Sequence, residues 1–287
     1  MRSKKHDKAS PRIATIIACF NAEQFIGRAL KSFAEQTYEN KELIIVDGGS
    51  SDGTVNAIKA SGAEAKVISE PDEGIFDAWN KGIKLASGDW IHFLGADDLY
   101  ADRFVFKNMS KILDGAESKS LIVYGQVSIT DKDGIEIHVS GAPWSAKDFR
   151  HNGMAIPHQG TFHHVSLFRD YGLFEIKSRY LHTYEMLLRY LRDHDAIFAG
   201  SILVARMETG GYSGRAENQL SLWIEYMRAQ RLHGTFRFNR TLAFKLLSGL
   251  VLRVLVVILP RKMAYDVIDF LRSLVGRPAL YRRARQR

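Results

Sequence analysis

Cysteine and long apolar runs are scarce in this chain, and each scarcity excludes a class of protein. The 287 residues contain one cysteine, Cys19, so no internal disulfide framework can form and a reducing compartment is expected. Because Cys19 lies in an apolar run, we expect a buried small side chain rather than a reactive thiol. The most apolar stretch, 246–259, spans fourteen residues and includes Arg253. A membrane-spanning helix needs about 20 apolar residues, so this stretch is not expected to cross a bilayer alone.

Targeting and nucleotide-binding signatures are also missing. The segment 1–12 is basic but has no apolar core of a secretory signal, so a cytoplasmic protein is expected. There is no G-x-x-x-x-G-K-[ST] loop, and no G-x-G-x-x-G follows the first predicted strand. These absences argue against a P-loop nucleotide hydrolase and a dinucleotide oxidoreductase. The histidines, His163 and His164 included, lack the spacing of metal ligands and are expected to be ordinary polar residues.

Positive charge is concentrated at one end of the chain. Lys and Arg number 40 against 32 Asp and Glu, a net charge of +8. Segment 228–287 holds 14 basic and two acidic residues, or +12, which leaves 26 basic and 30 acidic residues, or −4, for the remainder. Basic and apolar residues alternate in this tail, as in cationic helices that bind an anionic membrane surface. The alternative is packing on the main domain; nucleic acid is not expected, because recognisable binding modules are missing.

Short apolar runs alternate with amphipathic stretches along the first hundred residues. Ile75, Trp79 and Ile83 recur every four residues and mark one apolar helix face. The repeated strand–helix order predicts an α/β fold, with a Rossmann-like, mostly parallel central sheet flanked by helices. The predicted strands are 12–19, 43–47, 65–69 and 90–94, and the predicted helices are 22–34, 54–60 and 74–86.

The pattern is looser after residue 100. It predicts helices at 104–113, 184–192 and 217–232, strands at 121–127 and 202–206, a hairpin of 127–130 with 135–139, and a loop at 141–157. A boundary is expected near Gly234. The chain then divides into a basic N-terminal tail (1–10), a main domain (11–233) and an amphipathic basic helical tail (234–287).

Polar residues follow the predicted strands abruptly. In an open parallel sheet ligands bind outside the carboxyl ends of the strands, and three of the four ends here carry carboxylates. The adjacent pair Asp97-Asp98 would be relieved of mutual repulsion by a hard divalent cation that bridges to phosphate oxygens. Alternatively, Asp98 caps the next helix and Asp97 is solvated. Asp47 could accept a hydrogen bond from a nucleobase or shape the turn at Gly48-Gly49.

These strand ends resemble the family 2 glycosyltransferases. The matching segments are 14–21 (ATIIACFN), 42–54 (ELIIVDGGSSDGT) and 95–98 (GADD). Segments 70–83 (EPDEGIFDAWNKGI), 158–162 (HQGTF) and 184–189 (YEMLLR) are similar to the subgroup that assembles bacterial surface polysaccharides. The resemblance covers residues 11–210 approximately. It implies a GT-A fold, a nucleotide-sugar donor, a Mg²⁺ or Mn²⁺ ion and inversion at the anomeric carbon.

The resemblance also implies roles for individual residues. Asp97 and Asp98 occupy its metal motif, although Gly95 stands where many relatives have Asp or Asn, so fewer carboxylates would hold the cation. The residues that would line the nucleotide are Ala18, Phe20, Asn21 and Glu23, with Asp47 facing the base and Asp77, Asn80 and Lys81 near the ribose or diphosphate. His158, Gln159 and the aromatic face of Trp144 would orient the acceptor.

The expected catalytic base is the main departure from the family pattern. Many relatives place an Asp two residues before the position of Glu185, where this chain has Thr183. A hydroxyl is too weakly basic to deprotonate an alcohol at neutral pH. Glu185 is the first replacement expected and His182 the second, the alternative being that Glu185 faces solvent.

The expected reaction moves a sugar from a UDP-, GDP- or dTDP-sugar to a lipid-linked or oligosaccharide acceptor, in bacterial exopolysaccharide, capsule or lipopolysaccharide synthesis. By the family analogy the acceptor is carried on polyprenyl diphosphate, which a protein on the inner face of the cell membrane would meet. Two other readings stay open. One is a non-catalytic nucleotide-sugar-binding subunit of a membrane assembly, and the other is a polyprenyl-phosphate glycosyltransferase, whose anionic acceptor needs less help from a base.

Overall fold

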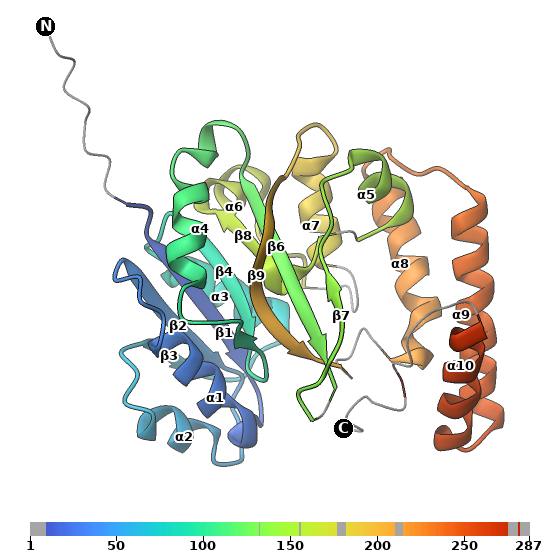
Figure 1. Ribbon diagram of the computed structural model, residues 1–287, viewed down its shortest axis with the longest axis horizontal. Coiled ribbons are helices and arrows are strands. Elements are labelled where there is room, and N and C mark those ends of the chain that lie inside the picture. The colour runs from blue at the N-terminus through green and yellow to red at the C-terminus, as the bar shows by residue number, and fades with distance from the viewer. Residues whose placement is uncertain are drawn as a thin grey trace, which may run out of the picture.

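The computed structural model describes residues 10–131, 133–154, 156–176, 182–209, 215–274 and 281. The expected N-terminal tail lies outside these residues except for Ser10. The strands form one sheet in the order β3-β2-β1-β4-β8-β6-β9-β5, with β7 paired to β6. Figure 1 shows this sheet between helices, with a separate helical pair at the far side of the molecule.

The first half of the chain forms a regular parallel α/β unit, as predicted. It consists of β1 (Ile13–Cys19), α1 (Glu23–Ala34), β2 (Lys41–Asp47), α2 (Thr54–Ala60), β3 (Lys66–Ser69), α3 (Ile75–Leu85) and β4 (Trp90–Gly95). Strands β2 and β4 both pair in parallel with β1, and β3 pairs in parallel with β2. Each predicted element is present, with ends shifted by up to two residues.

The second half is mixed and departs further from the prediction. It contains β5 (Leu99–Tyr100), α4 (Val105–Leu113), β6 (Ile122–Thr130), β7 (Glu136–Ser140), α5 (Ala146–Asn152), β8 (Thr161–His164), α6 (Val165–Tyr171), α7 (His182–Leu191), β9 (Ile197–Glu208) and α8 (Gln219–Leu232). The predicted β6–β7 hairpin is present. The predicted loop at 141–157 is wrong, since it contains α5, whose cap Ser145 accepts a hydrogen bond from the Asp148 amide. Elements β5, β8 and α6 were not predicted.

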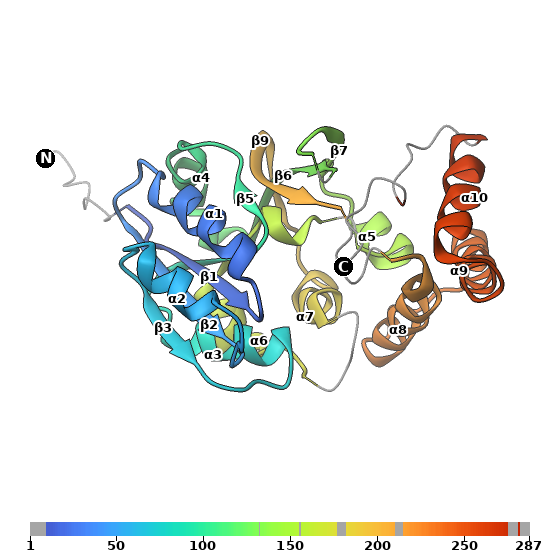
Figure 2. The same ribbon diagram turned by 90° about the horizontal axis from the view of Figure 1, so that it is seen from below.

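Two apolar layers enclose the sheet because alternate strand residues face opposite sides. Ile13 and Ile17 pack with residues of α1, α2 and α4. Ala14 and Ile16 pack in the other layer with residues of α3, α6 and α7. Figure 2 shows α1 and α4 on one side of the sheet and α3 and α6 on the other. The α/β architecture expected from the sequence is confirmed.

The basic tail forms two further helices, α9 (Arg240–Ile258) and α10 (Arg261–Leu274). Helix α9 packs on α8, and α10 packs on α9 (Figure 1). Helix α9 is longer than the apolar run that marks it in the sequence. Its 19 residues include an 18-residue window with a mean hydropathy of 2.1, so α9 passes the length and composition test for a membrane-spanning helix, whereas the prediction from the sequence considered only fourteen residues.

Candidate active site

The loops that follow the four parallel strands meet at one edge of the sheet. Because β3, β2, β1 and β4 are neighbours and run in the same direction, their carboxyl ends lie side by side. Segments 69–72, 47–50, 19–22 and 95–98 follow these ends in that spatial order. The sequence motifs are therefore brought together at the position where ligands bind in open α/β sheets.

Asp97 and Asp98 converge on Gly95 at the end of β4. The Asp98 amide donates to the Gly95 carbonyl over 3.1 Å, closing a tight turn. A methyl group added to Gly95 would lie 3.0 Å from Asp97 Oδ1 and closer still to Asp98 Oδ2. Asp98 is buried and Asp97 is half-buried. The glycine thus leaves room for two carboxylate groups to approach the same point.

This pair fits a magnesium or manganese ion that shares its ligands with a substrate. Both are hard cations with a preference for oxygen ligands, and Mg²⁺ is commonly held by one or two carboxylates, substrate phosphates and water. Among the residues that the structure describes, no group of three or more His, Cys, Asp or Glu side chains could hold a metal. Two carboxylates would need further ligands, which donor phosphates can supply.

Asn21 and Glu23 join the loop after β1 to the loop after β2. Asn21 adopts a positive φ of 49°, a conformation that Asn tolerates better than most residues. Its Oδ1 accepts from the Ser51 amide at 2.9 Å, and Glu23 Oε2 accepts from the Gly53 amide at 3.1 Å. These contacts give both side chains a part in shaping the two loops.

Asp47 accepts two hydrogen bonds from Ser50 and one from Ser69. Its carboxylate accepts from the Ser50 amide at 3.1 Å, from the Ser50 hydroxyl and from the Ser69 hydroxyl at 2.6 Å. Burial acts to raise the pKa of Asp47, but the bonds from Ser50 and Ser69 outweigh it and lower the pKa. Of the two sequence interpretations, the geometry favours the one in which Asp47 shapes the turn, since its side chain is fully buried.

Lys81 lies on α3 and contacts the loop that precedes this helix. Its Nζ lies 2.9 Å from Glu70 Oε1, 3.3 Å from Asp77 Oδ2 and 2.9 Å from the Pro71 carbonyl oxygen. The hydrogen bond to Glu70 is the main reason that the pKa of Lys81 is raised. Two carboxylates thus balance its charge, and Asp77 is engaged by the same contact.

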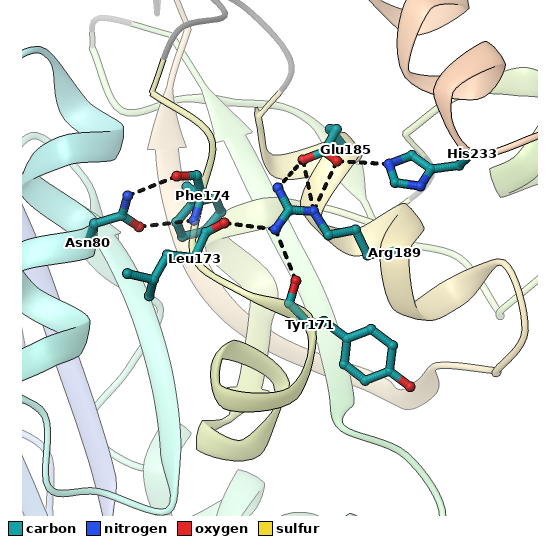
Figure 3. Close-up of polar contacts among 7 residues, drawn as sticks. All are labelled: Asn80, Tyr171, Leu173, Phe174, Glu185, Arg189 and His233. Atoms are coloured by element: carbon teal, nitrogen blue, oxygen red, sulfur yellow. Dashed lines mark hydrogen bonds and ion pairs between the residues drawn. The ribbon is translucent and has the colours of Figure 1, made fainter.

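Asn80 is buried, and its side chain binds the backbone of the segment that follows α6. Its Nδ2 donates to the Phe174 carbonyl at 2.8 Å, and its Oδ1 accepts from the Phe174 amide at 3.0 Å (Figure 3). This two-point contact ties α3 to the segment after α6. It satisfies the carboxamide internally, so the expected contact of Asn80 with the ribose or diphosphate is not supported by the geometry.

Phe20 and Ala18 complete the predicted nucleotide set. Phe20 follows β1 directly and is 64% exposed. An exposed ring at the carboxyl edge of a sheet can stack on a flat partner such as a base. Ala18 is half-buried at the end of β1.

Glu185 lies in a polar cluster on α7. Arg189 Nε donates to Glu185 Oε1 at 2.9 Å and Arg189 Nη2 to Oε2 at 2.6 Å, while His233 Nε2 lies 2.8 Å from Oε1. Arg189 Nη1 also donates to the carbonyls of Tyr171 and Leu173. Figure 3 shows Arg189 between Glu185 and these two carbonyls, with His233 approaching from the far side.

These contacts do not suit Glu185 for the catalytic base that the sequence suggests. Burial acts to raise the pKa of Glu185, but the hydrogen bonds from Arg189 and His233 lower it overall. A carboxylate with a lowered pKa and both oxygens engaged binds a proton weakly. Nor does Glu185 face solvent, the alternative interpretation, because its side chain is only 16% exposed. The side chain of His182 lies outside the described residues, and Thr183 is half-buried.

The expected acceptor residues have internal surroundings. The ring of His158 packs against Trp79 and Phe93, with centroids 4.6 and 5.5 Å apart. Both ring nitrogens of His158 are buried without a hydrogen-bond partner, and burial holds its pKa well below the ordinary value. Trp144 Nε1 donates to Asp195 Oδ1 at 2.7 Å. These contacts give His158 and Trp144 packing roles that the sequence reading missed.

Gln159 takes part through its backbone. Its carbonyl lies 3.0 Å from His92 Nε2, and His92 Nδ1 lies 2.9 Å from the Tyr100 hydroxyl, which contacts Thr15 Oγ1 at 2.7 Å. Because a carbonyl can only accept, His92 carries its proton on Nε2 and Tyr100 donates to Nδ1. His163 is also fully buried, so the expectation of an ordinary polar residue is wrong there.

A mixed sheet with a parallel half, helices on both faces and an acidic pair after the fourth strand define a sugar-transferring enzyme of the GT-A class. The model of the family named Glycosyl transferase family 2 matches residues 14–169, more than half of the chain, and the chain belongs to this family. It is 31% identical over 186 residues to a PGL/p-HBAD biosynthesis glycosyltransferase of Mycobacterium bovis, which covers 63% of this chain and 70% of that protein. An uncharacterized glycosyltransferase of Rickettsia typhi is 25% identical over 236 residues, covering 78% and 74%.

Solved structures show the same fold at low sequence identity. Staphylococcus aureus TarS 1–349 in complex with UDP-GlcNAc matches with a TM-score of 0.62 and 13% identity, covering 91% of this chain and 81% of that chain. The mannosyltransferase PcManGT from Pyrobaculum calidifontis, in complex with GDP-Man and Mn²⁺, matches with a TM-score of 0.59 and 14% identity, covering 94% and 81%. The prediction of a GT-A glycosyltransferase is confirmed.

Proposed function

We propose that this glycosyltransferase inverts the anomeric carbon of a UDP-, GDP- or dTDP-sugar and transfers the sugar to a lipid-linked or oligosaccharide acceptor in bacterial surface-glycan synthesis. The observation that carries the proposal is the convergence of Asp97 and Asp98 on Gly95 at the carboxyl edge of the sheet. The donor class is supported by two structural neighbours, which were solved with UDP-GlcNAc and with GDP-Man.

Asp97 and Asp98 would hold a Mg²⁺ or Mn²⁺ ion in this proposal. Such an ion, when bound, neutralises negative charge on the leaving nucleoside diphosphate. The two side chains come from one tight turn, so little rearrangement is needed to present their oxygens together. Preorganised groups of this kind stabilise a transition state because they do not have to reorient during the reaction.

The neighbouring loops would hold the nucleotide. Phe20 offers an exposed aromatic face, and half-buried Ala18 lies two residues before it in the chain. Asn21, Glu23 and Asp47 fix the two loops through bonds to backbone amides. Lys81 joins α3 to the preceding loop through its ion pair with Asp77 and its hydrogen bond to the Pro71 carbonyl. In the proposed complex these groups act mainly by positioning backbone and by excluding water.

Proton removal from the acceptor is assigned to His182 rather than Glu185. Glu185 is held by Arg189 and His233, which leaves His182, the second candidate from the sequence, at the start of the same helix. A polyprenyl-phosphate acceptor would need less of this help, and the partnered state of Glu185 favours that reading as a second candidate function. His158 and Trp144 then support the acceptor side through packing, and Gln159 through the hydrogen bond of its carbonyl with His92.

We also propose that the enzyme works on the inner face of the cell membrane, where a polyprenyl-diphosphate-linked acceptor would be reached by diffusion in two dimensions. The support is the net charge of +12 in segment 228–287 and the attraction of basic residues to anionic lipid.

The test is a transfer assay with labelled UDP-, GDP- and dTDP-sugars, Mn²⁺ and lipid-extracted acceptors. We expect product with one nucleotide class and none after chelation of the metal. Donor binding without transfer to any acceptor would instead identify a non-catalytic subunit. Transfer to polyprenyl phosphate alone would identify the second candidate function.

A further inference from the structure

Exposed apolar side chains are concentrated on the last two helices. Within the described part of the chain, 20 large apolar residues are exposed, and 12 of them lie on α9 and α10. On α9 they include Phe244, Val251 and Ile258, at 62%, 45% and 72% exposure. Successive members of this set are seven residues apart and therefore share one helix face. Such an extended apolar surface marks an interaction site.

Helix α9 is attached to the main domain along its whole length. At its start, Asn239 Nδ2 donates to the His151 carbonyl of α5 at 3.4 Å. At its middle, a Cβ added to Gly249 would lie 2.9 Å from the Leu220 amide nitrogen of α8. The glycine allows the two helices to approach closely, and Lys245 lies 4.0 Å from the Trp223 ring centre.

The far end of α9 returns to the same domain through α10. Arg261 Nη2 lies 2.9 Å from Glu217 Oε1, and the Tyr265 hydroxyl contacts Glu217 Oε2 at 3.2 Å. Tyr265 is buried in a small apolar cluster with Ala216. Both ends of α9 are thus held on one body, as Figure 2 illustrates by the position of α9 and α10 beside α8.

A helix held in this way cannot cross a bilayer without taking the domain with it. A spanning helix has its ends on opposite sides of roughly 30 Å of hydrocarbon. We infer that α9 and α10 form an in-plane anchor, which lies in the interface of an anionic membrane with the exposed stripe of α9 inserted. This inference rests on the proposed membrane association. It specifies which surface contacts the membrane and how deeply that surface is inserted.

Charge selects the lipid surface over a second copy of the chain. Arg240, Arg253, Arg261 and Lys262 are all exposed on or beside these helices. Two such surfaces would repel each other in a face-to-face dimer, whereas phosphatidylglycerol head groups would attract them. An interfacial helix with a basic border and an apolar stripe inserts to about 5–10 Å below the head groups.

The decisive experiment measures depth along α9 in the full-length protein. Phe244→Cys, Val251→Cys and Ile258→Cys would each be spin-labelled and bound to vesicles that contain phosphatidylglycerol. Native Cys19 is buried, and burial raises its pKa to about 12, so it should stay unlabelled. Ile135→Cys, on the exposed turn before β7, is the matched control and should report water.

In-plane binding predicts the same shallow depth at all three labels. A spanning helix would place the label at 251 about 10 Å deeper than those at 244 and 258, given a rise of about 1.5 Å per residue, and that profile would overturn the inference. Replacing Leu247 and Val254 together by Ser should weaken vesicle binding about tenfold. The pair Ile135→Ser and Val139→Ser should not.

Two further outcomes separate this inference from the proposed function. Absence of vesicle binding, or a dimer that forms through α9 in solution, would overturn the anchor. Transfer of sugar to a soluble acceptor by the same preparation would then leave the glycosyltransferase proposal standing. Loss of transfer with intact shallow binding would instead leave the anchor standing and contradict the proposed function.

Discussion

The donor edge of the sheet and the helices across from it use their carboxylates differently. At the donor edge, Asp97 and Asp98 are neighbours in sequence and converge within one turn. On α7, Glu185 is paired with Arg189 and with His233, which is 48 residues away. We propose that the first arrangement presents charge to a ligand, whereas in the second the charge of Glu185 is balanced within the fold. A place in a family motif therefore does not by itself give an acidic residue a chemical role, since the motif around Glu185 does not indicate its partners Arg189 and His233.

The largest effect is expected at the donor edge. Replacing both Asp97 and Asp98 by Asn should lower the rate of sugar transfer by about 10³-fold or more, because a preorganised charge at the leaving group is lost. The rate would be measured at saturating donor with Mn²⁺. Exposed Glu64 provides the control Glu64→Gln, which should transfer normally. Retention of full activity by the double variant would refute the metal assignment.

The second largest effect is expected from the buried histidines, which belong to neither of the two groups of carboxylates and should make the fold sensitive to acid. Burial lowers the pKa of His92 to about 4 and of His163 to about 3, and it lowers that of His158 as well. The unfolded chain binds these protons at about pH 6.5, so stability falls as the pH drops below that value. Below about pH 6.5, each histidine lowers the free energy of unfolding by up to about 1.4 kcal/mol for every pH unit of acidification. The three together approach a loss of about 4 kcal/mol per pH unit as the pH nears 5.

This acid sensitivity can be measured by urea unfolding between pH 7.5 and 5. His194 is exposed, so His194→Gln should show the same pH profile as the native chain. A free energy of unfolding that stays flat between pH 7 and 5 would mean that the three rings are hydrated or already protonated in the fold.

The link between the two regions is expected to be the next in size. Asn80→Ala removes both bonds to the Phe174 backbone and leaves buried peptide groups unsatisfied, which should cost about 2–4 kcal/mol. Thermal unfolding measures the loss. Asn56, exposed on α2, gives the control Asn56→Ala. If Asn80→Ala were as stable as the control but bound donor poorly, Asn80 would be a ligand-binding residue after all.

The smallest effect on turnover is expected at Glu185. Glu185→Gln should reduce stability by about 1–3 kcal/mol and change kcat less than tenfold, whereas His182→Gln should lower kcat by about 100-fold or more. Parallel assays at a temperature where every variant is folded make the comparison. A loss of 100-fold in kcat by Glu185→Gln at unchanged Tm would restore Glu185 as the base.

The parallel half of the fold could be read from the sequence because its determinants are local. The alternation of apolar runs and amphipathic stretches in residues 12–95 fixes strands and helices in order. The acidic turn after β4 is visible for the same reason. Element β8 could not be found in this way, because Thr161–His164 is a short polar-looking strand whose burial comes from insertion between β4 and β6.

The contacts of Glu185 could not be predicted from the sequence for a related reason. No sequence feature near Glu185 predicts its contact with His233, at the end of α8. The carbonyls that bind Arg189 belong to the backbone, so the pattern of side chains does not predict them either. The contact of Asn80 with the Phe174 backbone, 94 positions away, is likewise not indicated by the motif around Asn80. Such long-range contacts follow from tertiary packing.

The most direct test of the central claim is the dependence of donor binding on a divalent cation. Thermal unfolding would be followed with UDP-, GDP- and dTDP-sugars, each with and without Mn²⁺, for the native chain and the double Asp97→Asn, Asp98→Asn variant. We predict that one nucleotide class stabilises the native chain by about 2.7 kcal/mol at 100 times its Kd, only when Mn²⁺ is present, and leaves the variant unchanged. Equal stabilisation of both proteins, or stabilisation without any cation, would contradict the account.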